Sequence, residues 1–330
     1  MRLCHLRSVY NFITMLFESW RTIVKNIDEE LMLSIIVPTY NHEKYIIEAL
    51  NSIKMQKTKY KYEVLVGEDK STDNTKKILK QYEKDNPGFL TVFYRQENMA
   101  KAPLANSADL RHRAQGKYLI TLEGDDFWLD ELKLEKQISF LESHPDAVAV
   151  AHRCIVVDQD SKPNGEVYPE CINEIYTIDD FAKDILPGQL TTIMSRNYIK
   201  DNKFDYSILE KHLSPGDRLL VYMLLCYGKV YCLNEKMSAY RHIIKGGSSY
   251  SANIRYKFEK DEQWWRELMV YAKKHGSVGI VYIEFKYLLT LLRGVRYKDI
   301  NLKQFLERYM SITNKKKAVQ SLFMTYILKK

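Results

Sequence analysis

Residues 119–128 read Leu-Ile-Thr-Leu-Glu-Gly-Asp-Asp-Phe-Trp, and this stretch contains the main signal for the fold. A short apolar run that favours a β-strand ends in Glu123, Asp125 and Asp126, and Gly124 among them permits a sharp turn. Crowded like charges repel one another, so a cation is expected among them. Mg²⁺ or Mn²⁺ suits this all-oxygen set, because it takes its remaining ligands from water and phosphate. The alternative is a solvated acidic turn in front of a helix.

Three earlier segments repeat the pattern of apolar strand, polar exit and amphipathic helix. The predicted strands are centred near residues 36, 65, 92 and 120, a spacing of 27 to 29 residues. A helix is expected to begin near Asn41, with Ile46, Leu50 and Ile53 on its buried face. The alternation predicts an α/β fold with right-handed crossovers and a mostly parallel sheet sandwiched by helices.

The polar exits of these strands are predicted to line one crevice, because ligands bind at the carboxyl ends of the strands in such sheets. The exits are Thr39-Tyr40-Asn41, Glu68-Asp69 and residues 123–126. The sequence has no G-x-G-x-x-G after the first strand and no Walker loop. Hydride transfer and ATP hydrolysis by those architectures are therefore disfavoured.

The chain has 330 residues, 45% of them hydrophobic, which is enough for a substantial core in one or two domains. Its net charge is +8, and residues 281–330 alone hold eleven Lys and Arg against three acids. This distribution argues against nucleic-acid binding by the main domain and favours attraction of the tail to an anionic membrane surface. The alternatives are packing of the tail on the main domain and a nucleic-acid-binding tail. Apolar residues suited to a membrane interface are Tyr282, Phe285, Tyr287, Leu288, Leu289, Leu291, Leu292, Leu322, Phe323, Tyr326, Ile327 and Leu328.

Cysteine spacing and hydropathy indicate the cellular compartment in which the protein is expected. The five cysteines show neither metal-ligand spacing nor a paired framework, so buried thiols in a reducing compartment are expected. No apolar run reaches eighteen residues, so no membrane span is predicted. Glu18, Trp20 and Arg21 interrupt the opening segment, which favours an amphipathic extension over a secretory signal. The expected location is the cytoplasm, with peripheral attachment to the inner face of the membrane as an option.

Four motifs, in order, resemble glycosyltransferase family 2 with the GT-A fold. They are residues 34–41, residues 68–75, residues 123–128, and Gly216-Asp217-Arg218-Leu219-Leu220 followed by residues 237–241. The last motif is similar to that of bacterial enzymes building capsular or other surface polysaccharides. The resemblance implies a Rossmann-like GT-A domain over 33–250, with a nucleotide-sugar half over 33–130 and an acceptor half over 131–250. An N-terminal extension, 1–32, and a basic C-terminal helical region, 251–330, flank it.

The resemblance also implies roles for the polar exits of the first two strands. Pro38, Thr39 and Tyr40 would border the nucleotide base. Asp69, together with Glu68, would accept hydrogen bonds from the base or ribose. UDP is the expected nucleotide, because the family uses it most.

The acidic cluster would hold the metal and the diphosphate. Asp125 and Asp126 match the metal-binding motif for Mn²⁺ or Mg²⁺, and Asp125 would also border the nucleotide. Glu123 stands where the family often has aspartate, so it would either reach the ribose or bind the metal through water. Lys101 would contact phosphate, unless it is simply a solvated lysine.

A sugar transfer also needs a base that removes the proton of the acceptor hydroxyl. Departure of a nucleoside diphosphate from the anomeric carbon passes through an oxocarbenium-like state, and a divalent ion stabilises the charge on the leaving group. Asp217 follows Pro215-Gly216 at the start of an apolar helix and is the candidate base. The alternative is a helix-capping aspartate. A single base opposite the leaving group implies inversion.

The second half is expected to shape the acceptor site. His152 would point into the crevice, or be structural, as lone histidines commonly are. Arg241 and His242 precede a glycine-rich segment that would act as a lid, or merely as a connection. Residues 263–266 read Gln-Trp-Trp-Arg and only partly match the Q-x-x-R-W signature of processive synthases, so an amphipathic helix and single-sugar transfer are predicted.

These observations favour a metal-dependent, inverting transferase of a hexosyl or N-acetylhexosaminyl group. Its donor would be a nucleotide-sugar, and its acceptor a hydroxyl of a glycan or lipid-linked molecule in surface polysaccharide biosynthesis. The alternative is a catalytically silent GT-A-like protein that binds nucleotide-sugar or serves as a scaffold.

Overall fold

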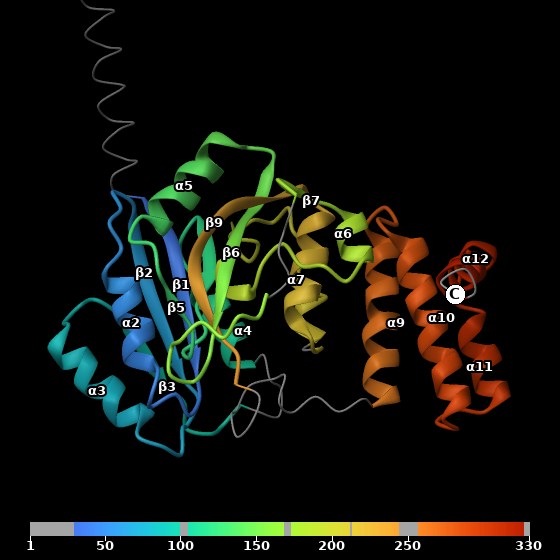
Figure 1. Ribbon diagram of the computed structural model, residues 1–330, viewed down its shortest axis with the longest axis horizontal. Coiled ribbons are helices and arrows are strands. Elements are labelled where there is room, and N and C mark those ends of the chain that lie inside the picture. Colours follow the sequence, from blue (N-terminus) through green and yellow to red (C-terminus); the bar gives the residue numbers. More distant parts are fainter. Residues whose placement is uncertain (1–29, 100–104, 168–172, 212, 244–256, 327–330) are drawn as a thin grey trace, which may run out of the picture.

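The computed structural model describes residues 30–99, 105–167, 173–211, 213–243 and 257–326. The expectations for the extension 1–29, for Lys101 and for the glycine-rich segment after His242 lie outside these ranges. Within them, a nine-stranded sheet is flanked by helices, and further C-terminal helices lie beside it (Figure 1). The α/β class predicted from the sequence is confirmed.

The amino-terminal half alternates strands and helices. Both neighbours of β1, namely β2 and β4, pair with it in parallel, and β3 pairs in parallel with β2. The carboxyl ends of four strands therefore share one edge of the sheet, as the predicted crossovers require. The elements are β1 (Leu31–Thr39), α2 (Ile46–Lys54), β2 (Lys61–Glu68), α3 (Thr75–Asp85), β3 (Thr91–Tyr94), α4 (Ala105–Arg113) and β4 (Tyr118–Thr121).

The second half extends the same sheet with mixed pairing. Strand β8 runs antiparallel between β4 and β6, β6 and β9 are parallel, and β5 and β7 run antiparallel to β9. Six of the nine strands thus point in one direction. The elements are β5 (Phe127–Trp128), α5 (Lys133–Ser143), β6 (Ala147–Val157), β7 (Ile175–Tyr176), α6 (Ile178–Ala182), the 3₁₀ turns Leu190–Thr192 and Leu209–Lys211, β8 (Met194–Arg196), α7 (Gly216–Leu225) and β9 (Lys229–Arg241).

Strand β1 is buried on both faces, which explains its mainly apolar sequence. Ile35 and Val37 belong to a core cluster that also contains residues of α2, α3 and α5. Ile36, between them, belongs to a second cluster with residues of α4, α7, α9 and α10. Alternating side chains of β1 therefore pack against helices on both faces of the sheet. The strand is held between these two helical layers.

Helix α2 begins at Ile46, later than the predicted start near Asn41. Asn41 has a left-handed backbone conformation with φ of 57°, which a helix cannot continue. Its side-chain oxygen instead accepts a hydrogen bond from the backbone N–H of Thr72 at 2.8 Å. A contact with a distant loop therefore decides the helix start.

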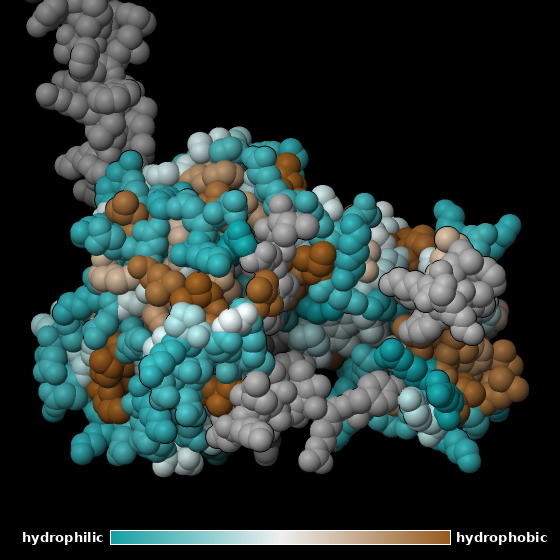
Figure 2. Space-filling model, viewed as in Figure 1, coloured by the Kyte–Doolittle hydropathy of each residue, from teal (hydrophilic) through white to brown (hydrophobic). Residues whose placement is uncertain are grey.

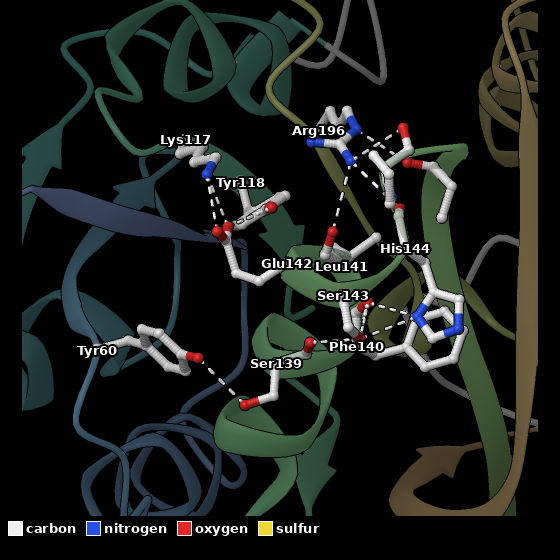
Figure 3. Close-up of polar contacts among 12 residues, drawn as sticks. Tyr60, Lys117, Tyr118, Ser139, Phe140, Leu141, Glu142, Ser143, His144 and Arg196 are labelled. Carbon is white, nitrogen blue, oxygen red and sulfur yellow. Dashed lines mark hydrogen bonds and ion pairs between the residues drawn. The ribbon is translucent and has the colours of Figure 1, made fainter. Parts of the chain in front are cut away.

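Polar contacts attach the carboxyl-terminal end of helix α5 to the sheet (Figure 3). Glu142 accepts a hydrogen bond from the Tyr118 hydroxyl at 2.6 Å and pairs with Lys117 at 2.7 Å, at the amino end of β4. Arg196 donates from Nε to the Ala147 carbonyl at 2.9 Å. These contacts fix the helix against the sheet that carries the acidic cluster at its other end.

Residues 257–326, the described part of the C-terminal region, form four helices: α9 (Phe258–Lys274), α10 (Ile280–Arg296), α11 (Leu302–Tyr309) and α12 (Lys315–Tyr326). Trp264 and Leu268 are buried, so the amphipathic helix predicted for residues 263–266 is confirmed. Tyr287, Leu288 and Leu291, which the sequence suggested for a membrane interface, are also buried, because α10 packs on α9. That part of the interface prediction is wrong.

Two further expectations concern cysteines and membrane spans. Cys154 and Cys226 are half-buried and form no disulfide, whereas Cys232 is disulfide-bonded, so the expectation of buried thiols is wrong at Cys232. Cysteine spacing along the chain cannot reveal such a bond, because pairing depends on proximity in the fold. None of the helices in the described ranges is both long and apolar enough to span a bilayer.

Candidate functional site

The exits of β1, β2 and β4 meet at a single edge, which we call the mouth; it is defined by Thr39, His42, Asp69, Glu123 and Asp125. The Asp69 amide donates a hydrogen bond to the Thr39 carbonyl at 3.0 Å. The Gly124 amide donates to the Pro38 carbonyl at 3.2 Å. These bonds continue the pairing of β1 beyond the strands and bring together the three predicted exits.

The loops after β1 and β2 are tied to each other by backbone-to-side-chain hydrogen bonds. The amide of Asn41 donates to Ser71 Oγ at 3.0 Å, and the amide of His42 donates to Thr75 Oγ1 at 2.9 Å. Another such bond joins the Glu43 amide to Asp73 Oδ2, also at 3.0 Å. The polar residues of the second motif therefore hold the first loop in place, which is a structural role that the sequence did not distinguish from binding.

His42 is a residue of the mouth that the sequence analysis missed. Its Nδ1 lies 3.1 Å from Thr39 Oγ1, and its Nε2 lies 3.8 Å from Asp125 Oδ2. A Cβ atom at Gly124 would come within 2.6 Å of His42 Nδ1 and 2.8 Å of Thr39 Oγ1. Glycine at this position is what allows the imidazole to reach the acidic turn. The only sequence signal was that His42 directly follows the first polar exit.

Burial and mutual repulsion raise the pKa values of the acidic cluster. The pKa of Glu123 is raised to about 8 by burial and then by the charges of Asp125 and Asp217. The pKa of Asp126 is raised well above its usual range by burial and by the charge of Asp125. Asp126 is 2% exposed; its Oδ1 accepts the Arg241 amide at 2.8 Å, while Oδ2 has no partner among the described residues. Part of the cluster is therefore neutral near pH 7 in the absence of a cation.

Asp217 lies in the first turn of α7 and is half-buried. Its Oδ1 accepts the Arg218 amide at 2.8 Å, and burial raises the pKa of its carboxyl. The charge of Asp217 also raises the pKa of Glu123, so the two carboxyls, 94 positions apart in the sequence, are near each other in space. The charge of Asp217 therefore acts on the acidic cluster, and its role as a base stays a prediction.

Arg111 is the second residue that the sequence analysis missed. It is 9% exposed and lines a cavity of about 440 Å³ between α4 and residues 198–210. The positive charge of Arg111 lowers the pKa of Glu123 and that of buried Tyr198, and so offsets part of the rise that burial causes in each. No sequence signal distinguishes Arg111 from the neighbouring His112 and Arg113, because only the orientation of α4 decides which side chain turns toward the acidic cluster.

The residues predicted to contact the nucleotide lie along the exits of β1 and β2. Pro38 and Thr39 are buried, and Tyr40 is half-buried. Glu68 is fully buried; its Oε1 accepts the Ser71 amide at 2.6 Å, whereas Oε2 has no partner within the described ranges. Asp69 accepts the Met99 amide at 2.8 Å, and burial raises the pKa of its carboxyl.

The structure places the three predicted acceptor or lid residues outside the mouth or in fixed contacts. His152 is completely buried, its Nδ1 lies 2.8 Å from the Arg153 carbonyl, and burial with the charge of Lys133 lowers its pKa. His242 pairs with Glu166 at 2.5 Å. His152 is therefore a neutral core residue here, which matches the structural alternative.

Arg241 is 1% exposed, and its guanidinium contacts residues of several different elements. Its Nε donates to the Asp125 carbonyl at 2.8 Å, its Nη1 to the Asp158 carbonyl at 2.9 Å, and its Nη2 pairs with Glu48 Oε2 at 2.6 Å. The guanidinium also lies 4.2 Å from the centroid of the Tyr45 ring. Arg241 thus holds the acidic turn from behind, and this arrangement gives no support to a mobile lid cation at this position.

The acidic cluster offers carboxylate oxygens for some of the ligand positions of a divalent cation. No group of three or more His, Cys, Asp or Glu side chains in the described part of the chain is arranged to hold a metal ion. Asp125 and Asp126 supply two carboxylates, and the buried Oδ2 of Asp126 is unpartnered there. Mg²⁺ and Mn²⁺ commonly take only one or two protein carboxylates and complete their shell with water and substrate phosphate.

Comparison with known proteins assigns the family. The model for "Glycosyl transferase family 2" matches residues 34–199. TuaG of Bacillus subtilis (strain 168), named as a teichuronic acid biosynthesis glycosyltransferase, is 32% identical over 206 residues, 62% of this chain and 78% of TuaG. The chain belongs to glycosyltransferase family 2. The predicted family is therefore confirmed.

Another relative and a solved structure are also similar to this family 2 chain. An uncharacterised protein of Mycobacterium tuberculosis (strain ATCC 25618 / H37Rv) is 30% identical over 232 residues, 68% of this chain. The matched region spans 63% of that relative, a little under two thirds of its length. Residues 1–349 of Staphylococcus aureus TarS, solved with UDP, superpose with a TM-score of 0.61 at 20% identity, over 87% of this chain and 82% of the TarS chain. This likeness confirms the GT-A fold.

Proposed function

We propose that this family 2 chain is a metal-dependent, inverting glycosyltransferase. It transfers a hexosyl or N-acetylhexosaminyl group from a nucleotide-sugar to a hydroxyl of a glycan or lipid-linked acceptor in surface polysaccharide biosynthesis. The observation that carries the proposal is the proximity of Asp217 to Glu123 in the acidic cluster at the mouth. Family membership and the names of relatives such as TuaG support it.

A UDP-sugar is the proposed donor. TarS, which shares the fold, has been solved with UDP and with UDP-GlcNAc, and its name describes a poly(ribitol-phosphate) beta-N-acetylglucosaminyltransferase. In this chain, Pro38, Thr39 and Tyr40 would border the base, and Glu68 and Asp69 would accept hydrogen bonds from base or ribose. The unpartnered Oε2 of Glu68 is a buried acceptor at this edge.

Asp217 is the proposed general base. As the acceptor oxygen forms its bond to the anomeric carbon, the bond from that carbon to the diphosphate breaks and the hydroxyl proton moves to Asp217. Its raised pKa makes the carboxylate a better proton acceptor than an exposed aspartate. The Arg218 amide fixes one carboxylate oxygen, so the other is left for the acceptor hydroxyl.

Charge on the leaving group would be stabilised through the acidic cluster and by the side chains near it. A Mn²⁺ or Mg²⁺ ion bound by Asp125 and Asp126 would supply Lewis-acid stabilisation of the diphosphate. Arg111 would add a buried positive charge, and His42 would orient Asp125. Lys101 stays a proposed phosphate contact on sequence grounds alone.

The test is release of UDP from a panel of UDP-sugars by the purified chain, with and without Mn²⁺. The wild type should release UDP, and Asp217→Asn should reduce the rate by about 10² to 10⁴. A thermal shift on donor binding should persist in Asp217→Asn; saturation at a hundred times the dissociation constant stabilises by about 2.7 kcal/mol. Stabilisation of the wild type without any UDP release would favour the silent nucleotide-sugar-binding alternative.

A further inference from the structure

The outer face of α11 exposes a stripe of apolar side chains. Leu302, Leu306 and Met310 are 66%, 52% and 70% exposed. They recur at intervals of four residues, so they lie on one side of the helix. Figure 2 shows a hydrophobic patch at the lower right, where Figure 1 places α11, with hydrophilic surface around it. We call these three residues the α11 stripe.

The opposite side of α11 explains why the stripe faces outward. Phe305 and Tyr309 are half-buried and pack against the core cluster that contains α9 and α10. Asn301 caps the helix by accepting the Gln304 amide at 2.9 Å, so the start of the helix is fixed. The orientation is set by this inner contact, and the α11 stripe is left without an intramolecular role.

Lysines lie near the α11 stripe along the chain, and Glu307 is the one exposed acid on α11. Lys303 lies on α11 itself, and Lys316 and Lys317 lie in the first turn of α12. All three are exposed, and none forms an ion pair with another residue in the described ranges. Lysines at a helix amino end are unfavourable, because the helix dipole is positive there. Their placement is therefore not explained by the stability of α12 and is suited to an external anionic partner.

The length of α11 argues against a second copy of the chain as that partner. The helix has 8 residues and is roughly 12 Å long, too short for the ~800 Å² per partner of a typical stable interface. A membrane surface needs no such area, because apolar side chains insert individually while lysines meet anionic headgroups.

We propose that the α11 stripe, flanked by Lys303, Lys316 and Lys317, docks on an anionic membrane surface. Leu302, Leu306 and Met310 enter the interfacial layer, and the lysines contact the lipid headgroups. This proposal concerns a surface apart from the mouth and goes beyond the proposed transfer reaction. It keeps the anionic surface predicted for the tail and assigns the apolar contact to α11, since Tyr287, Leu288 and Leu291 are buried.

The experiment is co-sedimentation of the full chain with vesicles of phosphatidylglycerol and phosphatidylcholine, compared with pure phosphatidylcholine. The wild type should bind the anionic vesicles and not the neutral ones. The triple variant Leu302→Ser, Leu306→Ser, Met310→Ser should reduce binding at least tenfold, as should Lys316→Glu with Lys317→Glu. Val270→Ser is the matched control, because Val270 is a 59% exposed apolar residue of α9 that does not belong to the α11 stripe, and this variant should bind as the wild type does.

Three results would overturn the proposal. They are failure of the wild type to bind anionic vesicles, equal binding by the triple variant, and a wild-type dimer that the triple variant converts to a monomer in light scattering. The last result would assign the α11 stripe to a second copy. Circular dichroism checks that each variant is folded. Release of UDP with a soluble acceptor should be unchanged in the triple variant, so failure of membrane docking and failure of the transfer reaction are separable.

Discussion

The indole Nε1 of Trp264 on α9 donates a hydrogen bond to the backbone carbonyl of Pro215 at 3.2 Å, two residues before Asp217. This bond connects the C-terminal helical region to the start of α7. The conformation in which the candidate base enters the mouth therefore depends on a helix outside the residues that match the family.

Replacing Trp264 by Phe should remove this bond and leave the Pro215 carbonyl poorly satisfied. We expect a loss of about 1–3 kcal/mol in the free energy of unfolding and a lower kcat for UDP release with little change in donor KM. Urea unfolding and steady-state kinetics measure both. Trp265→Phe is the control, since Trp265 is similarly buried and lacks this bond. Equal kcat losses in both variants would contradict a positioning role for Trp264.

Gly124→Ala should disturb the mouth directly. The added Cβ would meet His42 Nδ1 at 2.6 Å and Thr39 Oγ1 at 2.8 Å, so the imidazole must move away from Asp125. Overpacking of this kind costs about 1–3 kcal/mol. We expect donor affinity, measured by calorimetry with UDP and Mn²⁺, to fall at least fivefold. Unchanged affinity and unchanged stability would show that the mouth relaxes around the methyl group.

The raised pKa of Glu123 predicts a pH dependence of stability. The folded state holds the Glu123 proton up to a pKa of about 8, whereas an unfolded glutamate releases it near pH 4.5. The resulting stabilisation is complete below pH 4.5 and is lost as the pH rises through 8. Stability in urea should therefore fall between pH 5 and pH 8, and Glu123→Gln should flatten that fall.

The exposed Glu97→Gln variant is the control for removing one negative charge from the surface. It should retain the full pH dependence of the wild type. If Glu123→Gln and Glu97→Gln gave parallel curves, the carboxyl of Glu123 would not be the group that titrates in this range.

Variants of Arg241 test whether this residue has a structural role or the lid role predicted from the sequence. Loss of its bonds to Asp125, Asp158 and Glu48 should lower the free energy of unfolding by about 3–5 kcal/mol in Arg241→Met, because buried polar partners are left behind. Glu48→Gln, which keeps an acceptor for the guanidinium, should cost less. A variant of Arg241 with wild-type stability and impaired transfer would instead restore the lid interpretation.

The sequence by itself determined the alternation of strands and helices, the family, and the convergence of Thr39, Asp69 and the acidic residues. These follow from local patterns, since a strand period, a polar exit and a helical period are each encoded by adjacent residues. Crossover connections make these strands parallel, so their polar exits lie at the same edge of the sheet.

Only the tertiary structure decided which side chains share the mouth and which are taken up elsewhere. The charge of Arg111 acts on Glu123 although α4 lies apart from it in the sequence, and the guanidinium of Arg241 pairs with Glu48, 193 positions earlier. His152 and Tyr287 look suited to ligand or membrane contact, but packing buries them. Such outcomes depend on distances between residues far apart in the chain, and no local pattern of residues encodes those distances.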